Sequence, residues 1–500
     1  MSSAGERAPA ESISTFRRRW VGFGAGLVLA VLVYLVLPDD LNHAAKVTAG
    51  MAVLMGLWWM TEAIPIPATA LLPLLVFPML VDDVGVSDIG AFYGSGIIFL
   101  FMGGFLIALA MQRWNLHRRI ALLTVRAMGT GATRVIAGFM LATAFLSMWV
   151  SNTATAVMMV PIGVSVLILT GTVAADDRDA EVQQQVKDSN FGTALMLGIA
   201  YSASVGSLAT IIGTPPNTLL VGYLQDEQNI TIGFGQWMLL GLPLAAVLLV
   251  LTWLLLAKVI FRPEIKEIPG GKELFDSELE KLGAPSRGER RVLMVFLLAA
   301  LSWIAFPLIW EKPPVSDAGI AVGAGLLLFI LPAGSKLGVR LLDWATAAQL
   351  PWGVLLLFGG GLALSSQFSS SGLTEWIGAQ AKSLQGLSIL LLVGLVTTVV
   401  IFLTELTSNT ATAATFLPVI GGVAVGIGQD PLLLTIPVAL AATCAFMLPV
   451  ATPPNAIAYG SGYVSIGHML KGGIWLNLAS ILLISVATTT LAVWVFNIAT

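Results

Sequence analysis

The pentapeptide Ser-Asn-Thr-Ala-Thr occurs twice in this chain, at residues 151–155 and 408–412, each time inside a long apolar stretch. A motif with two adjacent prolines follows each copy, as GTPPN at 213–217 and as ATPPN at 451–455. Hydroxyl and amide oxygens, with backbone carbonyls that proline frees by stopping a helix, suit an alkali cation. Hydroxyl and amide hydrogens, and the amino-terminal end of the helix that restarts, suit an anion. The motifs therefore predict sites where a cation and an anion bind together.

One asparagine in each pentapeptide, Asn152 or Asn409, can serve both ligands. Its carbonyl oxygen can bind a cation while its NH2 group donates to a carboxylate. The alternative is a structural role, in which such polar residues join neighbouring helices. Two copies, each followed by a double-proline break, favour a binding site, because polar backbone at membrane depth persists where it lines a cavity or packs against protein.

Positive charge is scarce around these motifs, since no Lys or Arg lies within residues 191–257 or 383–470. Helix dipoles supply about half a charge each. Bound cations would have to neutralise the rest of a dianion, which predicts that sodium binds before the substrate. Glu62 and Glu405 are carboxylates in or beside apolar segments and are candidates by default. We favour a structural role for them, because their counterparts in the repeat are not both acidic.

The elements that hold these motifs are membrane-spanning helices. The 500 residues are 57% hydrophobic and 11% charged, with a mean hydropathy of +0.89. Apolar runs long enough to cross a bilayer recur throughout, and they lack the alternation of a membrane barrel. We predict an all-α polytopic membrane protein with about eleven crossings. The apolar spans are expected near 21–37, 48–81, 92–111, 120–170, 192–223, 234–260, 292–310, 317–332, 350–366, 387–428, 432–464 and 473–497.

The first 19 residues are polar and end in Arg17, Arg18 and Arg19, with no cleavage pattern of a signal peptide. Other basic clusters lie around residues 113–119 and 258–291. The positive-inside rule puts these segments, and the amino terminus, in the cytoplasm. We therefore expect a retained cytoplasmic tail on a multi-pass protein of the plasma (inner) membrane.

The two motif pairs also indicate an internal repeat. Ser151 precedes Thr214 by 63 residues and Ser408 precedes Thr452 by 44, a difference of 19 that matches the polar stretch 171–190, found only in the first copy. Duplicated halves that bind substrate near the midplane are typical of secondary transporters. An odd number of crossings between equivalent points would make the repeats inverted.

Other functional classes find little support in the chain. It has no HExxH, G-x-S-x-G or Walker A pattern, so neither familiar hydrolytic chemistry nor ATP drive is indicated. A membrane enzyme would need a nucleophile, base or metal set that we cannot assemble. A passive channel would show flux without saturation or coupling.

The chain resembles the divalent anion/sodium symporter family over nearly its whole length after the tail. The resemblance rests on TEAIPIPATALLP (61–73), LSMWVSNTATAVMMVP (146–161), GTPPN, TELTSNTATAATFLP (404–418) and FMLPVATPPNAIAYGSG (446–462). It implies a homodimer of inverted-repeat protomers, with two re-entrant hairpins and a transport domain that moves as an elevator against a scaffold. The implied division is a tail at 1–19, scaffold helices at 20–130 and 291–385, transport-domain halves at 131–262 and 386–500, and a cytoplasmic linker at 263–290.

The resemblance also implies binding residues. One sodium site would use Ser147, Ser151, Asn152 and the Gly213 carbonyl, and the other Thr404, Thr407, Asn409 and the Ala451 carbonyl. The substrate carboxylates would contact Asn152, Thr153, Thr214, Ser408, Asn409, Thr410, Thr452 and Pro453. Ser207 stands where many members have a second glycine after Gly206.

The function implied is sodium-coupled symport of a divalent anion, for which a C4-dicarboxylate such as succinate, malate or fumarate is the leading candidate. The alternatives are a sodium-independent dicarboxylate exchanger, or citrate or sulfate as substrate. The expected partners are the dicarboxylate, co-transported sodium ions, membrane lipid and a second copy of the chain, without nucleic acid, organic cofactor or enzymatic activity.

Overall fold

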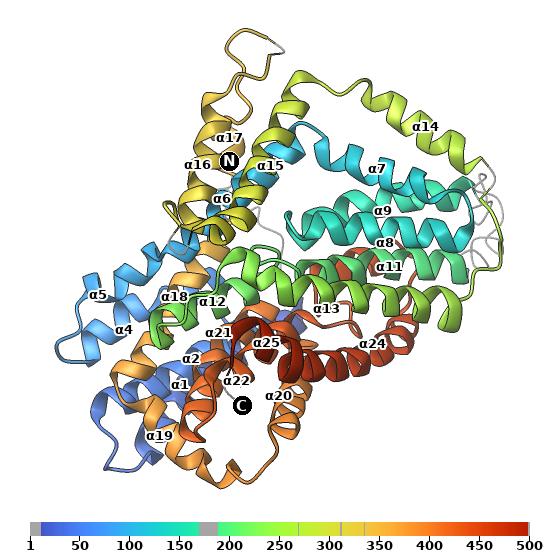
Figure 1. Ribbon diagram of the computed structural model, residues 1–500. Helices are drawn as coiled ribbons and strands as arrows, with labels where there is room; N and C mark the ends of the chain where they lie inside the picture. The colour runs from blue at the N-terminus through green and yellow to red at the C-terminus, as the bar shows by residue number, and fades with distance from the viewer. Residues whose placement is uncertain (1–11, 170–188, 269, 311–312, 335, 499–500) are drawn as a thin grey trace, which may run out of the picture.

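The computed structural model describes residues 12–169, 189–268, 270–310, 313–334 and 336–498 (Figure 1). Over these residues the chain is helical, with two isolated β-bridges and no strand, so the predicted all-α class is confirmed. The tail up to residue 11 and most of the polar stretch predicted at 171–190 lie outside the described residues. The first helix, α1, begins at Ile13, earlier than the predicted tail boundary, because the Ser12 side chain caps it by accepting from the Thr15 N–H.

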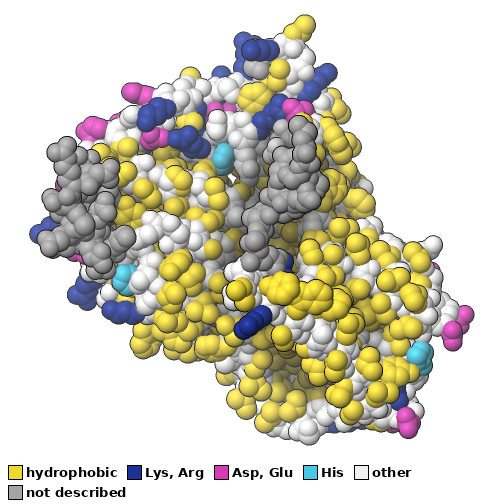
Figure 2. Space-filling model, turned by 180° about the vertical axis from the view of Figure 1, so that it is seen from behind, with side chains coloured by type: hydrophobic (Ala, Val, Ile, Leu, Met, Phe, Trp, Pro, Cys, Tyr) yellow, Lys and Arg dark blue, Asp and Glu magenta, His cyan; other side chains and the backbone are white. Residues whose placement is uncertain are grey.

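Among the described residues, eight helical segments are long and apolar enough to cross a membrane. Figure 2 shows hydrophobic side chains over the broad middle and lower part of the visible face, with charged side chains mainly near its edges. The prediction of a multi-spanning membrane protein is thereby confirmed. These segments are α1 (Ile13–Val36), α5 to α6 (Val86–Arg113), α9 (Asn152–Leu169), α13 with its π-helical end (Phe234–Ile260), α15 (Arg287–Ile309), α18 (Trp352–Ser370), α21 (Asn409–Gly426) and α24 to α25 (Ile466–Phe496).

Two helical hairpins carry the pentapeptides. The first joins α8 (Ala132–Ser147) to α9, and the second joins α20 (Ile389–Thr404) to α21. In the first tip Ser151 Oγ accepts the Ala154 N–H at 3.2 Å, which stabilises the start of α9. The apolar spans expected near 120–170 and 387–428 are therefore interrupted at the pentapeptides.

The double prolines begin new helices after a break. The first break separates α11 (Asn190–Ser207) from α12 (Pro215–Gln228), and the second separates α22 (Pro431–Thr443) from α23 (Pro453–Gly460). Proline is favoured in the first helical turn because its missing N–H has no partner there. Both predicted breaks are confirmed. Each half thus has the same order of elements, a hairpin, a broken helix and a long helix.

The helix α11 lies at the centre of the first half and is buried from Phe191 to Ser207. It packs against α8, α9 and α13, and Figure 1 shows these helices running side by side. The described α-helices not yet named lie outside this group. They are α2 (His43–Thr61), α3 (Ile66–Thr69), α4 (Leu72–Leu80), α7 (Leu116–Met128), α14 (Gly271–Leu282), α16 (Asp317–Ile330), α17 (Trp344–Ala347) and α19 (Leu373–Gln380).

Two amphipathic helices, α7 and α14, were not predicted. The sequence predicted an apolar span near 120–170 and a cytoplasmic linker over 263–290, and α7 and α14, which lie in parts of these segments, pack against each other. Arg118 pairs with Glu278 at 2.6 Å and Arg126 with Asp276 at 2.7 Å. Because α7 leads from α6 into the first hairpin and α14 lies between α13 and α15, this pairing joins the two connections.

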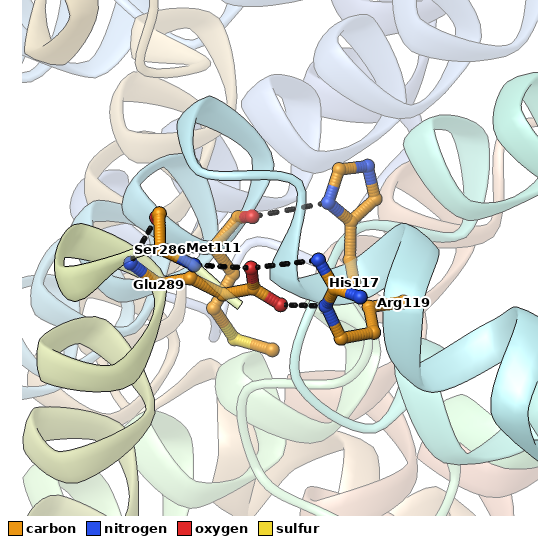
Figure 3. A network of polar contacts seen from close by, with 5 residues as sticks. All are labelled: Met111, His117, Arg119, Ser286 and Glu289. Carbon is orange, nitrogen blue, oxygen red and sulfur yellow. Dashed lines mark hydrogen bonds and ion pairs between the residues drawn. The ribbon is translucent and has the colours of Figure 1, made fainter. Parts of the chain in front are cut away.

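A buried ion pair fixes the start of α7 against the start of α15 (Figure 3). Arg119 binds Glu289 through both carboxylate oxygens, and both side chains are largely buried. Glu289 also forms a capping box with Ser286. His117 Nδ1 lies 3.0 Å from the Met111 carbonyl oxygen, which closes the turn between α6 and α7. Burial, aided by nearby positive charge, lowers the pKa of His117 below its usual range.

Candidate functional site

Both hairpin tips and both helix breaks line one cavity of about 780 Å³. All eight residues predicted to contact substrate line it: Asn152, Thr153, Thr214, Ser408, Asn409, Thr410, Thr452 and Pro453. Six of the eight predicted sodium-site residues line it as well: Ser151, Asn152, Gly213, Thr407, Asn409 and Ala451. The other two, Ser147 and Thr404, are fully buried behind the hairpin tips. Residues far apart in the sequence therefore come together as the repeat suggested.

Four helices begin at this cavity. They are α9, α12, α21 and α23, whose first residues Asn152, Pro215, Asn409 and Pro453 all line it. Each helix amino terminus carries about half a positive charge, while unpaired N–H groups are expected at α9 and α21 only, since α12 and α23 open with two prolines. Four such ends directed at one cavity favour an anion there.

Four other helices end next to it with their carbonyl groups. The helices α8, α11, α20 and α22 end at Ser147, Ser207, Thr404 and Thr443, just before the tips and breaks. Carboxyl-terminal helix ends carry partial negative charge and carbonyl oxygens without intrahelical partners. The same tips and breaks that offer donors to an anion thus offer acceptors to a cation.

Three oxygens converge behind the first hairpin tip. Ser147 Oγ lies 2.7 Å from Asn152 Oδ1 and 2.6 Å from the Ala203 carbonyl oxygen. A hydroxyl has one proton, so it can donate to only one of these two acceptors. Ser147 Oγ and the acceptor to which it does not donate then face each other as two oxygen atoms with no proton between them. A cation bound there would stabilise this arrangement.

The second hairpin repeats this geometry. Thr404 Oγ1 lies 2.9 Å from Asn409 Oδ1 and 3.0 Å from the Ala442 carbonyl oxygen. The carbonyls of Ala203 and Ala442 were not predicted, because a backbone oxygen leaves no trace in residue type. The Thr407 hydroxyl turns away, donating to the Leu403 carbonyl at 3.0 Å.

Two further predicted residues, Thr214 and Thr452, make hydrogen bonds at the helix breaks. Thr214 Oγ1 lies 3.3 Å from Thr443 Oγ1 of the other half, while Thr452 Oγ1 accepts the Asn455 N–H at 3.3 Å and so caps α23. Asn217, the asparagine of GTPPN, donates its Nδ2 to the Thr210 carbonyl at 2.9 Å. These contacts keep the broken segments in a fixed shape around the cavity.

Glu405 ties the second hairpin tip to the second break. Its carboxylate accepts the N–H groups of Phe446, Met447 and Leu448 and the Nδ2 of Asn477, at 2.7 to 3.1 Å. All four are donors, so both carboxylate oxygens act as acceptors. This contact gives Glu405 the structural role that the sequence favoured.

Two charged side chains line the cavity among the described residues, Arg18 of α1 and Glu62 at the end of α2. Arg18 Nη2 lies 3.2 Å from Glu62 Oε2, and both side chains are about half exposed. Sequence reasoning considered only the charges near the motifs in the chain and so missed this cation. Glu62 adopts a left-handed backbone conformation with φ of 51°, which directs the chain away from α2.

Comparison with known proteins gives consistent matches. The family model described as the sodium:sulfate symporter transmembrane region matches residues 18–498. The chain is 44% identical over 470 residues to the "sodium-dependent dicarboxylate transporter SdcS" of Staphylococcus saprophyticus, covering 93% of this chain and 89% of that protein. The protein of the same name from Staphylococcus aureus strain USA300 is 44% identical over 469 residues, with 92% and 89% covered.

Two solved transporter structures share the fold. The YdaH transporter of Alcanivorax borkumensis matches with a TM-score of 0.56 and 14% identity, covering 90% of this chain and 98% of that one. MtrF of Neisseria gonorrhoeae, from a class titled antimetabolite efflux pumps, matches with a TM-score of 0.54 and 13% identity, covering 92% and 97%. At this identity the likeness concerns the architecture alone.

Proposed function

Because the chain belongs to the sodium:sulfate symporter family, we propose that it is a secondary active transporter that carries a C4-dicarboxylate together with sodium ions. Succinate, malate and fumarate are the leading substrates, because relatives 44% identical to this chain are named sodium-dependent dicarboxylate transporters. Citrate and sulfate are the alternative substrates that a test must include. A sodium-independent exchanger is the alternative mechanism.

The observation that carries this proposal is the meeting of four helix amino termini and two clusters of oxygen atoms at one cavity. The four amino-terminal helix ends, with about half a positive charge each, favour a dianion, and the four carboxyl-terminal ends beside them favour cations. The oxygen clusters around Ser147 and Thr404 supply neutral acceptors but no proton for every contact. Two sodium ions bound there would stabilise the clusters and add positive charge behind the dianion.

We assign the ligands to the two halves on this basis. The first sodium site comprises Ser147, Ser151, Asn152 and the carbonyl of Gly213, with the carbonyl of Ala203 added by its contact with Ser147. The second comprises Thr404, Thr407, Asn409 and the carbonyl of Ala451, with the carbonyl of Ala442. Thr407 would contribute its backbone oxygen, since its hydroxyl is engaged within the hairpin.

The substrate carboxylates would then contact the residues at the helix starts. They are Asn152, Thr153, Thr214, Ser408, Asn409, Thr410, Thr452 and Pro453, all of which line the cavity. Since the donors are neutral, sodium would bind first and the dianion second. Arg18 would contribute to attraction at a distance rather than to the bound state, because Glu62 already pairs with it.

For the whole molecule we propose two inverted repeats with about eleven crossings and two re-entrant hairpins, assembled as a homodimer. Residues 131–262 and 386–500 would form the moving transport domain, and 20–130 and 291–385 the scaffold. The matching order of hairpin, break and long helix in the two halves supports the repeat. The basic residues Arg17 to Arg19 favour a cytoplasmic amino terminus in the inner membrane.

The proposal is tested by uptake of radiolabelled succinate into proteoliposomes with an inward sodium gradient, compared with potassium in place of sodium. Asn152→Ala and Asn409→Ala should each abolish sodium-driven uptake. Thr398→Ala is the control, because this hydroxyl bonds back to the Gly394 carbonyl within α20 and does not line the cavity. Uptake that ignores sodium but requires internal dicarboxylate would instead identify an exchanger. Absence of succinate uptake, with uptake of citrate or sulfate, would change the substrate.

A further inference from the structure

The two halves of the cavity differ at one buried position. Asn217 Nδ2 reaches the carbonyl oxygen of Ser207, ten residues earlier, and Asn455 Nδ2 reaches that of Ala445, also ten residues earlier. Ser207 and Ala445 therefore occupy equivalent places at the two breaks. Both are fully buried, but only Ser207 has a side-chain oxygen.

The Ser207 hydroxyl holds the amide of Asn152. Ser207 Oγ donates to the Ser204 carbonyl at 2.7 Å, which uses its only proton. Its lone pairs are then left to accept from Asn152 Nδ2 at 3.3 Å. Since Ser147 contacts Asn152 Oδ1, the amide is fixed at both ends, with its oxygen toward the oxygen cluster and its nitrogen toward Ser207.

The amide of Asn409 is held at one end only. Thr404 contacts its Oδ1, as Ser147 does in the first half. Its Nδ2 has no acceptor within hydrogen-bond distance among the described residues, and Asn409 lines the cavity. Ala445 has no oxygen with which to engage it. Both N–H groups of the Asn409 NH2 are thus available to a ligand in the cavity, while one of the two N–H groups of Asn152 is already donated to Ser207.

We propose that Ser207 makes the two half-sites unequal: it orients the Asn152 amide oxygen toward the cation, so that Asn409 donates to the substrate more freely than Asn152 does. This rests on the proposed sodium-coupled transport. Ser207 is a positioning residue, since it lies outside the cavity lining and acts through Asn152. Without its hydroxyl the Asn152 amide can rotate and turn its NH2 group toward the cation, which lowers the affinity for sodium.

The test compares Ser207→Ala with Ser202→Ala, a buried serine of the same helix whose hydroxyl has no partner among the described residues. Loss of one hydrogen bond predicts a rise of about three- to tenfold in the sodium concentration for half-maximal succinate uptake. The KM for succinate at saturating sodium should stay unchanged. Sodium-dependent thermal stabilisation of the purified protein without substrate should shift by the same factor, and Ser202→Ala should match the wild type in both.

The reciprocal variant, Ala445→Ser, adds the hydroxyl beside Asn409. It should raise the succinate KM about three- to tenfold and leave half-maximal sodium unchanged, because its hydroxyl competes with the substrate for an N–H group of Asn409. This result is independent of Ser207→Ala and serves if that variant fails to fold.

The inference is overturned if Ser207→Ala leaves half-maximal sodium unchanged, or if its effect falls on the maximal rate or the succinate KM instead. An effect of Ala445→Ser on sodium rather than on succinate would also overturn it. Failure of the proposed function is a distinct result, since it is seen in the wild type as the absence of sodium-dependent uptake and stabilisation.

Discussion

Glu405 should be the most sensitive buried side chain of the second half. It accepts from Phe446 N, Met447 N and Asn477 Nδ2 through one oxygen and from Leu448 N through the other. Glu405→Gln can keep the first three contacts but directs an NH2 group at the Leu448 N–H. One unsatisfied buried donor costs about 1–3 kcal/mol. Glu405→Ala leaves all four donors unsatisfied, which at about 1 kcal/mol each costs about 4 kcal/mol.

The assay is denaturant unfolding of the detergent-solubilised protein, followed by sodium-driven uptake in proteoliposomes. Glu375→Gln is the matched control, since Glu375 is exposed on the first turn of α19 and should change stability by less than about 0.5 kcal/mol. Glu405→Gln should also lower uptake, because the segment that it holds leads into the second break. If Glu405→Ala unfolds at the same denaturant concentration as Glu375→Gln, the carboxylate does not hold the break and the reasoning fails.

Three further predictions concern the oxygen clusters, the cavity charge and the connecting helices. Ser147→Ala and Thr404→Val should each raise half-maximal sodium in uptake assays at least about tenfold, because contacts to a charged group contribute about 1.5–3 kcal/mol; unchanged sodium curves would remove these hydroxyls from the sites. Arg18→Gln should raise the succinate KM at low ionic strength, with the difference shrinking as choline chloride is added, because salt screens half-exposed charges; a salt-independent effect would indicate direct contact. The hydrogen bond from Lys281, with further help from α7, holds the pKa of Glu278 below its usual value of 4.5. The ionised Glu278 carboxylate therefore stabilises the folded protein above pH 4.5, and this stabilisation is lost as pH falls through the lowered pKa. The melting temperature of Glu278→Gln should lie below that of the wild type at pH 7 and approach it in acid. A difference in melting temperature that persists in acid would contradict a role for the Glu278 charge.

The sequence predicted the fold best where backbone chemistry is explicit. Adjacent prolines at 215–216 and 453–454 must interrupt a helix, and the repeated pentapeptides mark equivalent interruptions in the hairpins. The helices α7 and α14 were missed for the opposite reason. One lies partly in the apolar span expected near 120–170 and the other in the linker expected at 263–290, and their polar faces meet only in the folded chain, as in the ion pair of Arg118 with Glu278.

At the site, the sequence identified side chains but not what fixes their orientation. The motif residues Asn152 and Asn409 were identified, and both line the cavity. The carbonyls of Ala203 and Ala442 could not be identified, since every residue has a carbonyl and only the folded backbone brings these two beside a hydroxyl. Arg18 was missed because its distance along the chain from the motifs hides its closeness in space.

In the proposed mechanism, the two kinds of helix end would account for coupling between the ions without a separate device. A cation behind Asn152 or Asn409 would bind the amide oxygen and polarise the NH2 group, which would then donate more strongly to a carboxylate in the cavity. The dianion in turn adds negative charge within reach of both cation clusters. Such coupling is reciprocal, so whatever factor sodium adds to the affinity for the substrate, the substrate must add to the affinity for sodium. A hydroxyl such as that of Ser207, which fixes one amide and leaves the other available, would then decide which half transmits more of that coupling.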